Sequence, residues 1–367
     1  MTQQWTREQA WDWYNQLPWI RGFNYVASDC VNRMEQWQEY EHEKKVVTFE
    51  REFALAQENG FNAIRSVLPF EPWYYEHDGF MKRLDNFLTL AHKYGLGVMI
   101  VFGNDCTVPK GMYTEPKFGP QPVDWGYHGG VLRSPHGEIG DHGYSLLDEP
   151  ELAAAWTDMV GEIVGEFGHD NRVQIWDIFN EPGNGKRGDM SLPHMERFFE
   201  RARSKDPIQP LTAGPWTIAE RNAEALPKIQ RRALELSDVI SYHDYAEIET
   251  SVKILSFLKT LGRPIINTEW LNRIQHNDVR THLPLFYLER VGIYNWGFVV
   301  GKSQTHEPWN ITWTNYDNGK TDYDFTKWQH DLFRPNHRPY DPKEIELFRF
   351  YGKLADEDFK RGTVKTK

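Results

Sequence analysis

The chain has 367 residues, of which 40% are hydrophobic and 26% are charged, and its formal net charge is −11. This is the composition of an ordinary soluble protein with enough apolar side chains for a large core. The acidic balance argues against general binding to nucleic-acid phosphates, which requires clustered lysine and arginine. No stretch approaches the roughly 18 apolar residues that a membrane span requires. A neutral or small polar ligand fits these numbers better.

The chain contains two cysteines, Cys30 and Cys106. They could pair, but two cysteines make no disulfide framework, and a reducing compartment is the simpler interpretation. The first eight residues lack a basic segment followed by an apolar run, so no signal peptide is predicted. We therefore expect a cytoplasmic protein.

Eight short apolar runs alternate with amphipathic stretches, a rhythm typical of repeated strand–helix units. The predicted strands are, in chain order, Ile20–Tyr25, Asn62–Val67, Gly97–Phe102, Val173–Phe179, Gln209–Ala213, Val239–Tyr242, Pro264–Thr268 and Ile293–Phe298. The predicted helices are Thr48–Asn59, Met81–Tyr94, Glu151–Phe167, Pro193–Ser204, Ala223–Leu236, Ile248–Leu261, Asp278–Arg290 and Pro342–Leu354.

Eight such units predict a single (β/α)8 (TIM) barrel domain over residues 1–367, with its active site at the carboxyl ends of the strands. An open, doubly wound sheet is the alternative. The glycine-rich dinucleotide motif that often follows the first strand of such a sheet is absent here, which makes the alternative less favourable.

The connection after the third strand, about residues 104–147, is far longer than the 2–6 residues usual between a strand and the next helix. It contains Trp125, Tyr127, His128 and His136 among many glycines and prolines. Loops of this length in compact domains are commonly functional or disordered. By the strand assignment, this loop belongs to the catalytic face of the barrel.

Two buried strands end in a glutamate: the fourth runs into Glu181, and the seventh ends near Glu269. Either residue alone could be an exposed loop glutamate or the partner of an arginine. Together they favour a catalytic pair, because the carboxyl ends of the fourth and seventh strands lie at the same barrel mouth. Two carboxyl groups roughly 5 Å apart suit a double displacement at an anomeric carbon, in which one attacks and the other protonates the leaving oxygen. The 14% aromatic content also suits stacking against sugar rings.

Asn180-Glu181-Pro182 and Thr268-Glu269-Trp270 resemble the acid/base and nucleophile motifs of the (β/α)8 retaining glycosidases, and glycoside hydrolase family 5 most of all. The resemblance extends over nearly the whole chain, from Arg21 to Trp296. It implies that Glu181 is the acid/base and Glu269 the nucleophile of a retaining glycoside hydrolase.

The same resemblance implies roles for five further residues. Arg65 matches the arginine that steadies the nucleophile, and Asn180 the asparagine that binds the sugar 2-hydroxyl. His243 and Tyr245 match a His-x-Tyr pair lining the −1 sugar site, in which the tyrosine donates to the nucleophile. Trp296 matches the tryptophan that forms the floor of that site.

One departure concerns the third strand, after which family 5 usually has a histidine. Here the chain reads Gly103-Asn104-Asp105, so Asn104 or Asp105 is predicted to hold substrate hydroxyls instead. Trp125 and His128 of the long loop are further predicted substrate-binding residues.

No metal or other cofactor is predicted. His128, His136 and His142 have no spacing typical of a metal site, and a double displacement with two glutamates needs no ion.

The prediction for function is an exo-acting β-mannosidase on short oligosaccharides such as mannosyl-β-1,4-N-acetylglucosamine, a substrate that the family resemblance implies. An endo-β-glucanase or endo-β-mannanase is the alternative, and a barrel that binds sugar without cleaving it is the non-enzymatic one. The predicted partner is a short β-linked oligosaccharide, with no nucleic acid and no membrane.

Overall fold

The computed structural model of the protein describes residues 3–112, 117–123, 127, 141–218, 225–320 and 322–362. Within them lie eight strands: β1 (Arg21–Asn24), β2 (Ala63–Val67), β3 (Gly97–Asn104), β4 (Val173–Asn180), β5 (Leu211–Gly214), β6 (Ile240–His243), β7 (Ile265–Trp270) and β8 (Gly292–Asn295). All eight strands predicted from the apolar runs are confirmed, each within a few residues of its predicted ends.

The strands close into a barrel. Neighbouring strands pair in parallel in the order β5-β4-β3-β2-β1-β8-β7-β6. The two outer strands of this order meet, because the Asp238 N–H donates to the Leu211 carbonyl (2.8 Å) and the His243 N–H to the Pro215 carbonyl (3.0 Å). The predicted (β/α)8 barrel is therefore confirmed. An open sheet would leave these two edges apart.

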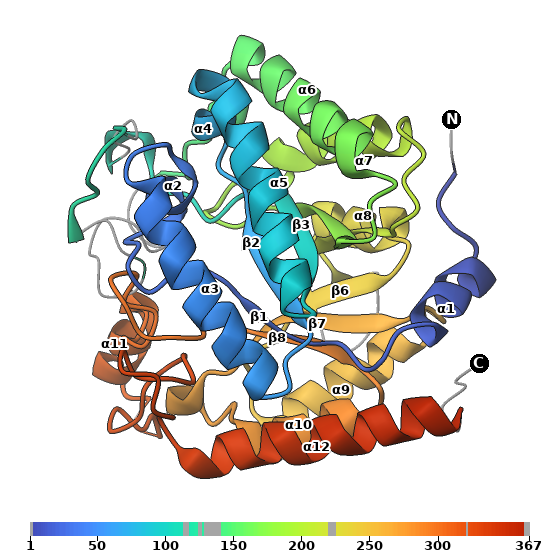
Figure 1. Ribbon diagram of the computed structural model, residues 1–367, viewed down its shortest axis with the longest axis vertical. Helices are drawn as coiled ribbons and strands as arrows, with labels where there is room; N and C mark the ends of the chain where they lie inside the picture. The colour runs from blue at the N-terminus through green and yellow to red at the C-terminus, as the bar shows by residue number, and fades with distance from the viewer. Residues whose placement is uncertain are drawn as a thin grey trace.

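Helices surround the barrel (Figure 1). Those that match the predicted helices are α3 (His42–Glu58), α5 (His77–Lys93), α6 (Pro150–Phe167), α7 (Leu192–Arg203), α8 (Lys228–Leu236), α9 (Ile248–Lys259), α10 (Val279–Leu288) and α12 (Pro342–Arg361). Helix α8 begins later than predicted, and α12 extends one to two turns further. Among the described residues, no helix combines the length and the apolar character needed to cross a membrane.

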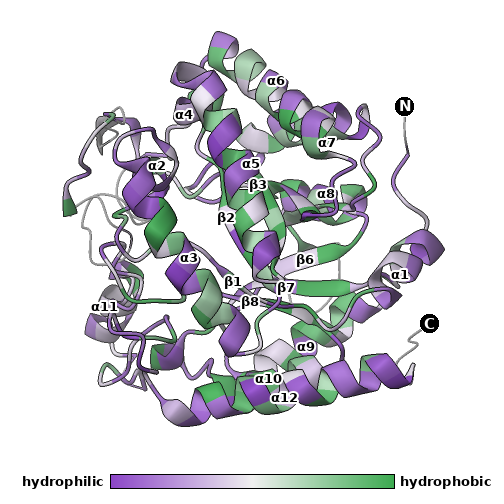
Figure 2. Cartoon of the chain, in the orientation of Figure 1, coloured by the Kyte–Doolittle hydropathy of each residue, from purple (hydrophilic) through white to green (hydrophobic). Residues whose placement is uncertain are grey.

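The core lies between the strands and the helices, and the helical pattern explains why. Helix α5 buries Phe80, Leu84, Phe87, Leu88 and Ala91, which recur every three or four residues and so share one face. Figure 2 shows the result for the described residues: apolar residues concentrate in the strands, and the surface helices alternate between apolar and polar residues. Burial of this apolar area is the main favourable contribution to folding, at about 25 cal/mol per Å².

The helix α1 (Arg7–Asn15) was not predicted, and it closes the amino-terminal end of the barrel. Its start is fixed by a capping box, in which the Thr6 hydroxyl accepts from Gln9 N–H and the Gln9 side chain accepts from Thr6 N–H. Its Tyr14 packs in a buried cluster with Met99 and Tyr294 inside the barrel. The Thr-x-x-Gln pattern was a sequence signal for this helix.

Three shorter helices were also missed: α2 (Arg33–Trp37), α4 (Phe70–Tyr75) and α11 (Asn310–Asp317). They lie within connections that follow strands. In Figure 1, α1 lies at the right of the barrel, whereas α2 and α11 lie at the opposite end. That opposite end is the mouth formed by the carboxyl ends of the strands.

Two further details concern expectations from the sequence: the end of the last strand and the pairing of the two cysteines. The strand predicted to reach Phe298 ends at Asn295, because Gly297 has a φ of +76°, outside extended geometry. Cys30 and Cys106 do not pair; both thiols are free.

Glu52 of α3 gives a testable pH dependence of stability. Burial raises its pKa to about 7, although the hydroxyls of Ser28 and Tyr25 donate to it and oppose the rise. An unfolded glutamate has a pKa near 4.3, so between about pH 4 and pH 7 the folded chain binds more protons than the unfolded one. Stability from this group is therefore complete at low pH and is lost as the pH rises through the window.

Glu52→Gln mimics the protonated group and is expected to remove this loss, which amounts to about 4 kcal/mol above pH 7. Urea unfolding of both proteins at about pH 5 and about pH 8 checks the prediction. The free energy of unfolding of the variant, relative to that of the native chain, should be greater at pH 8 than at pH 5. A difference in unfolding free energy that stays the same at both pH values would contradict the assignment.

Candidate active site

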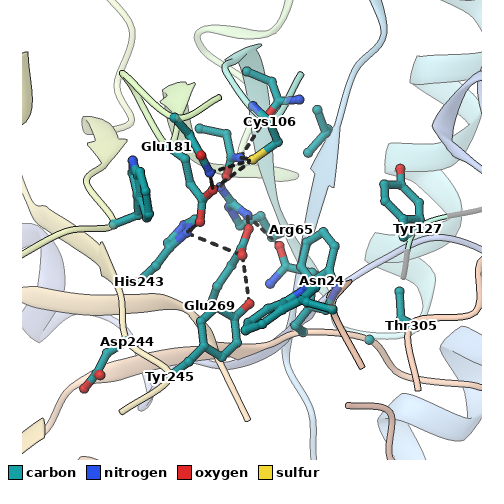
Figure 3. Close-up of a pocket in the computed structure, with 18 of the residues that line it drawn as sticks. Asn24, Arg65, Cys106, Tyr127, Glu181, His243, Asp244, Tyr245, Glu269 and Thr305 are labelled. Atoms are coloured by element: carbon teal, nitrogen blue, oxygen red, sulfur yellow. Dashed lines mark hydrogen bonds and ion pairs between the residues drawn. The ribbon is translucent and has the colours of Figure 1, made fainter. Parts of the chain in front are cut away.

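A cavity of about 770 Å³ opens at the carboxyl ends of the strands. Residues predicted for the site come together around it, although they lie far apart in the sequence (Figure 3). Those that line the cavity are Arg65, Asn104, Asn180, Glu181, His243, Tyr245, Glu269 and Trp296. The barrel therefore gathers eight of the eleven predicted side chains at one mouth.

Glu181 directly follows β4 and has a left-handed backbone, with φ of 46°. This conformation costs a non-glycine residue energy, and such strain is typical of functional sites. The Glu181 N–H donates to the Gly214 carbonyl (3.1 Å), which holds the turn against β5. His243 Nδ1 lies 2.7 Å from Oε1, while the Cys106 thiol (2.8 Å) and the Asn184 amide donate to Oε2. Three donors thus fix the carboxylate in the cavity.

Glu269 lies in β7, one residue before the strand ends. Its Oε1 accepts from the Arg65 guanidinium (2.8 Å), and its Oε2 accepts from the Tyr245 hydroxyl (2.9 Å). Burial and the Glu269 charge raise the pKa of Tyr245 well above its usual value, so the phenol keeps its proton and remains a donor. The donors hold both oxygens of Glu269 in place.

The two glutamates face each other across the cavity. One carboxylate oxygen of each lies within 4.8 Å of the other. His243 Nδ1 lies between them, 2.7 Å from Glu181 and 3.4 Å from Glu269 (Figure 3). This spacing matches the roughly 5 Å of retaining glycosidases and falls short of the 6.5–9.5 Å that inverting enzymes need for a water molecule.

The two carboxyl groups titrate as a pair. Burial raises the pKa of Glu269, and the Glu181 charge adds to the rise, against the effects of His243 and Arg65. Burial also opposes ionisation of Glu181, but the hydrogen bonds from His243, Cys106 and Asn184 outweigh it and lower that pKa. The surroundings therefore favour the charge on Glu181 over that on Glu269.

Arg65 of β2 connects four strands beneath the cavity. Its Nε (3.0 Å) and Nη2 (2.8 Å) both donate to Asp177 Oδ2. The same guanidinium donates to Asn24 (2.6 Å), Asn180 (2.5 Å) and Glu269 (2.8 Å). The side chains of Arg65 and Asp177 are both 0% exposed, so each charge depends on the other for compensation.

Asn104 and Asp105 differ in what they contact. Asn104 lines the cavity and accepts from the Asn180 amide (2.8 Å). Asp105 is fully buried outside the lining, where its carboxylate accepts from the Gly183 N–H (2.7 Å), Arg187 (3.0 Å) and Ser191 (2.8 Å). Burial raises its pKa to about 6, against the Arg187 charge. The prediction that Asp105 holds substrate is not supported; it orders the turn after Glu181.

The long connection after β3 reaches the opposite side of the mouth. Gln38 donates to the Gly119 carbonyl (2.8 Å), and Gln304 donates to the Val123 carbonyl (2.9 Å). The Tyr127 N–H donates to the Ser303 carbonyl (2.8 Å), and Tyr127 lines the cavity. The described residues of this connection, 117–123 and 127, therefore contact the segments that follow β8 and α2.

Trp296 follows β8 and forms part of the cavity wall. Its ring meets Tyr127 edge to face, with centroids 6.1 Å apart and an interplanar angle of 88°. Trp125, His128 and His136 lie outside the described residues, so their predicted places stay predictions.

Several cavity residues escaped the sequence analysis. Those in direct contact with the predicted residues are Asn24, Cys106 and Asn184, and those further along the wall include Trp216, Trp309 and Asp331. Asp177, which pairs with Arg65 beneath the cavity, also escaped it. Asn184 stands three residues after Glu181, and Cys106 two after Asn104, so their proximity to the motifs was an available signal. Nothing local marked Trp309 or Asp331, which follow β8 at long distance in the chain.

Atoms of metal-ligand type gather at one place in the described part of the chain, namely Glu181, His243 and Glu269. These atoms already take part in the hydrogen bonds given above. The two-carboxylate chemistry requires no metal.

Two close carboxylates with these donors, at the mouth of a (β/α)8 barrel, are the arrangement of a retaining glycoside hydrolase. A family model described as cellulase (glycosyl hydrolase family 5) matches residues 27–328. The chain belongs to glycoside hydrolase family 5, which is a retaining family. No curated protein matches the chain.

Solved structures with the same fold include several enzymes that act on mannosides. A family 5 mannosidase from Rhizomucor miehei, in complex with mannosyl-fructose, is 14% identical with a TM-score of 0.58, over 96% of both chains. An exo-β-1,4-mannosidase from an Opitutaceae bacterium is 16% identical with a TM-score of 0.57, over 94% of this chain and 60% of that one. An endo-β-1,4-mannanase from Thermotoga petrophila is 14% identical with a TM-score of 0.54, over 96% and 78%. At these identities the likeness concerns the fold.

Proposed function

We propose that the protein hydrolyses short β-mannosides from the non-reducing end with retention of configuration, and that mannosyl-β-1,4-N-acetylglucosamine is a suitable substrate. Glu181 acts as the acid/base and Glu269 as the nucleophile. The observation that carries the chemistry is the close pair of carboxylates, one held by Arg65 and Tyr245 and the other by His243.

The reaction follows from this geometry. Glu269 attacks the anomeric carbon and forms a glycosyl ester, while the bond to the leaving oxygen breaks and Glu181 gives that oxygen its proton. Water then attacks the same carbon, Glu181 takes a proton from it, and the ester bond to Glu269 breaks. The first step needs the proton on Glu181 and the charge on Glu269. A bound sugar favours this distribution, because its glycosidic oxygen accepts a hydrogen bond from protonated Glu181, and its anomeric carbon, which becomes positive as the bond breaks, is attracted to ionised Glu269.

Exo action is supported by the long connection after β3. Its contacts with Gln38, Ser303 and Gln304 carry it across the side of the mouth between β1 and β8. Tyr127 of this connection stands against Trp296, the predicted floor of the −1 site. The described residues 117–123 and 127 thus lie along this side of the mouth, which favours a site that accepts one sugar there. The mannosidases and mannanases among the structural neighbours support a mannoside as substrate.

An endo-acting β-mannanase or β-glucanase is the second candidate. The observation that favours it is the size of the cavity, about 770 Å³, which exceeds the volume of one sugar. Trp216, 38% exposed, and Trp309 also line the cavity and could stack further sugars.

Product analysis separates the two candidates. A panel of nitrophenyl β-glycosides identifies the preferred sugar, and proton NMR of the first product tests for retention. On a β-1,4-linked mannotetraose, release of mannose alone supports exo action, whereas disaccharide from internal cleavage supports the endo alternative. An initial α-anomer from a β-substrate would rule out double displacement.

Tyr245→Phe tests the contact with Glu269. The variant loses the one hydroxyl that holds Oε2, so we expect kcat to fall about 10²-fold, the scale for one preorganised donor, with little change in KM. Steady-state kinetics on the preferred substrate measures both constants. Tyr316→Phe, an exposed tyrosine outside the cavity, is the control and should keep the native rate. An unchanged kcat for Tyr245→Phe would place its hydroxyl outside the reacting centre.

A further inference from the structure

Cys106 lies two residues past the end of β3, and its thiol is part of the cavity wall. Its Sγ is 2.8 Å from Glu181 Oε2, and the two are joined by a dashed line in Figure 3. The amides of Asn180 (3.4 Å) and Asn184 (3.6 Å) point at the same sulfur. The Cys106 N–H donates to Asn104 Oδ1 (3.2 Å), which fixes the backbone that carries the thiol.

The surroundings of Cys106 favour the protonated form of its thiol. Burial raises the pKa of Cys106 well above its usual value, and the charges of Glu181 and Glu269 raise it further. A thiolate, the form that acts as a nucleophile, is therefore disfavoured. What the side chain offers its neighbours is a neutral S–H group, which is a weak donor through its hydrogen and a weak acceptor through its sulfur.

This dual character matters because an acid/base changes its protonation state twice in each cycle. When Glu181 is ionised, Oε2 can accept from both Cys106 and Asn184. When Oε2 carries a proton, that proton needs an acceptor. The Asn184 amide NH2 group is only a donor and cannot accept this proton. The Cys106 sulfur can accept it after its S–H bond has rotated away.

We propose that Cys106 is a positioning residue for Glu181, whose thiol donates to Oε2 in the ionised state and accepts from it in the protonated state. This inference rests on the proposed function, because it assigns Glu181 as the acid/base. Cys106 lies in the segment after β3, where family 5 usually carries a histidine. Its proposed role is to position Glu181, for which Cys106 need not touch the sugar.

The test compares Cys106→Ala and Cys106→Ser with Cys30→Ala, which removes the other free thiol, buried in the core. Each is assayed on 2,4-dinitrophenyl and phenyl glycosides of the preferred sugar. The dinitrophenyl group leaves with little help from an acid, whereas the phenyl group needs it. Cys106→Ala should lower kcat/KM about tenfold for the phenyl glycoside only. Cys106→Ser, which can also donate and accept, should recover most of this loss.

The pH profile supplies a second readout, because the alkaline limb of kcat/KM reports the ionisation of the acid. Loss of a donor to the carboxylate should move this limb to higher pH in Cys106→Ala, and Cys30→Ala should leave it in place. Equal losses on both substrates with an unmoved limb would show that Cys106 only supports the structure. Native rates in Cys106→Ala would show that it has no role.

An infrared measurement keeps this inference separate from the proposed function. The S–H stretching band of Cys106 is found by subtracting the Cys106→Ala spectrum from that of the native protein. It should shift in Glu181→Gln, because a neutral amide replaces the carboxylate at the thiol. If the band shifts but no β-glycoside is cleaved, the proposed function fails and the contact stands. If glycosides are cleaved and the band does not respond, the positioning role is wrong.

Discussion

Glu269→Ala should abolish turnover on every substrate, whereas Glu181→Ala should keep the glycosylation step wherever the leaving group needs no proton. The reason is that, in the proposed mechanism, Glu269 forms a covalent bond with the sugar and Glu181 only transfers protons. For unactivated glycosides we expect Glu181→Ala to lower kcat by about 10²–10⁴-fold, the usual contribution of general acid catalysis. With a dinitrophenyl glycoside, glycosylation should stay fast, and the intermediate on Glu269 should accumulate.

Azide distinguishes the two variants by the product that forms. In Glu181→Ala, azide attacks the glycosyl ester and should give the β-azide. In Glu269→Ala, azide takes the place of the carboxylate and should give the α-azide. Proton NMR of the isolated azides decides between them. The Gln variants of both residues keep the side-chain volume and serve as controls for packing. Near-native activity of both alanine variants on a natural substrate would overturn the assignment.

The parts of this molecule that could be predicted from sequence are those whose signals are local. The strands β4 and β7 are apolar runs that end in polar residues, and a closed barrel places such ends at one mouth. Glu181 and Glu269 could thus be paired despite the residues between them. Arg65 was predicted from the family resemblance, since its place at the end of a strand would also fit a structural ion pair.

The parts that could not be predicted depend on contacts between distant segments. Asp105 has the residue type of a sugar ligand, but Arg187 and Ser191, far along the chain, enclose it. Asp177 points inward beneath the cavity and is matched to Arg65 only once β2 and β4 are in register through β3. Helix α1 had a local signal, but its place at the barrel floor depends on Tyr14 reaching the inner cluster.

Arg65→Met should weaken both the fold and the reaction, because it removes the charge that two buried carboxylates share. Asp177 is 0% exposed, and its Oδ2 accepts only from Arg65 in the contacts described above. Loss of one partner of a buried ion pair costs about 3–5 kcal/mol, which urea unfolding at neutral pH measures. Glu269 also loses the cation at Oε1, so kcat should fall about 10²–10³-fold.

A second substitution separates the two effects. Asp177→Asn in the Arg65→Met background removes the uncompensated charge at Asp177, so stability should recover in part, while kcat stays low because Glu269 still lacks its cation. Arg203→Met is the control: it removes the arginine that pairs with the buried Asp238 at the amino-terminal end of the barrel, away from the cavity. It should lower stability and leave kcat of the folded protein unchanged. If the double variant regained kcat together with stability, Arg65 would serve the fold alone, and the charge of Glu269 would have to be held by Tyr245 and His243 without it.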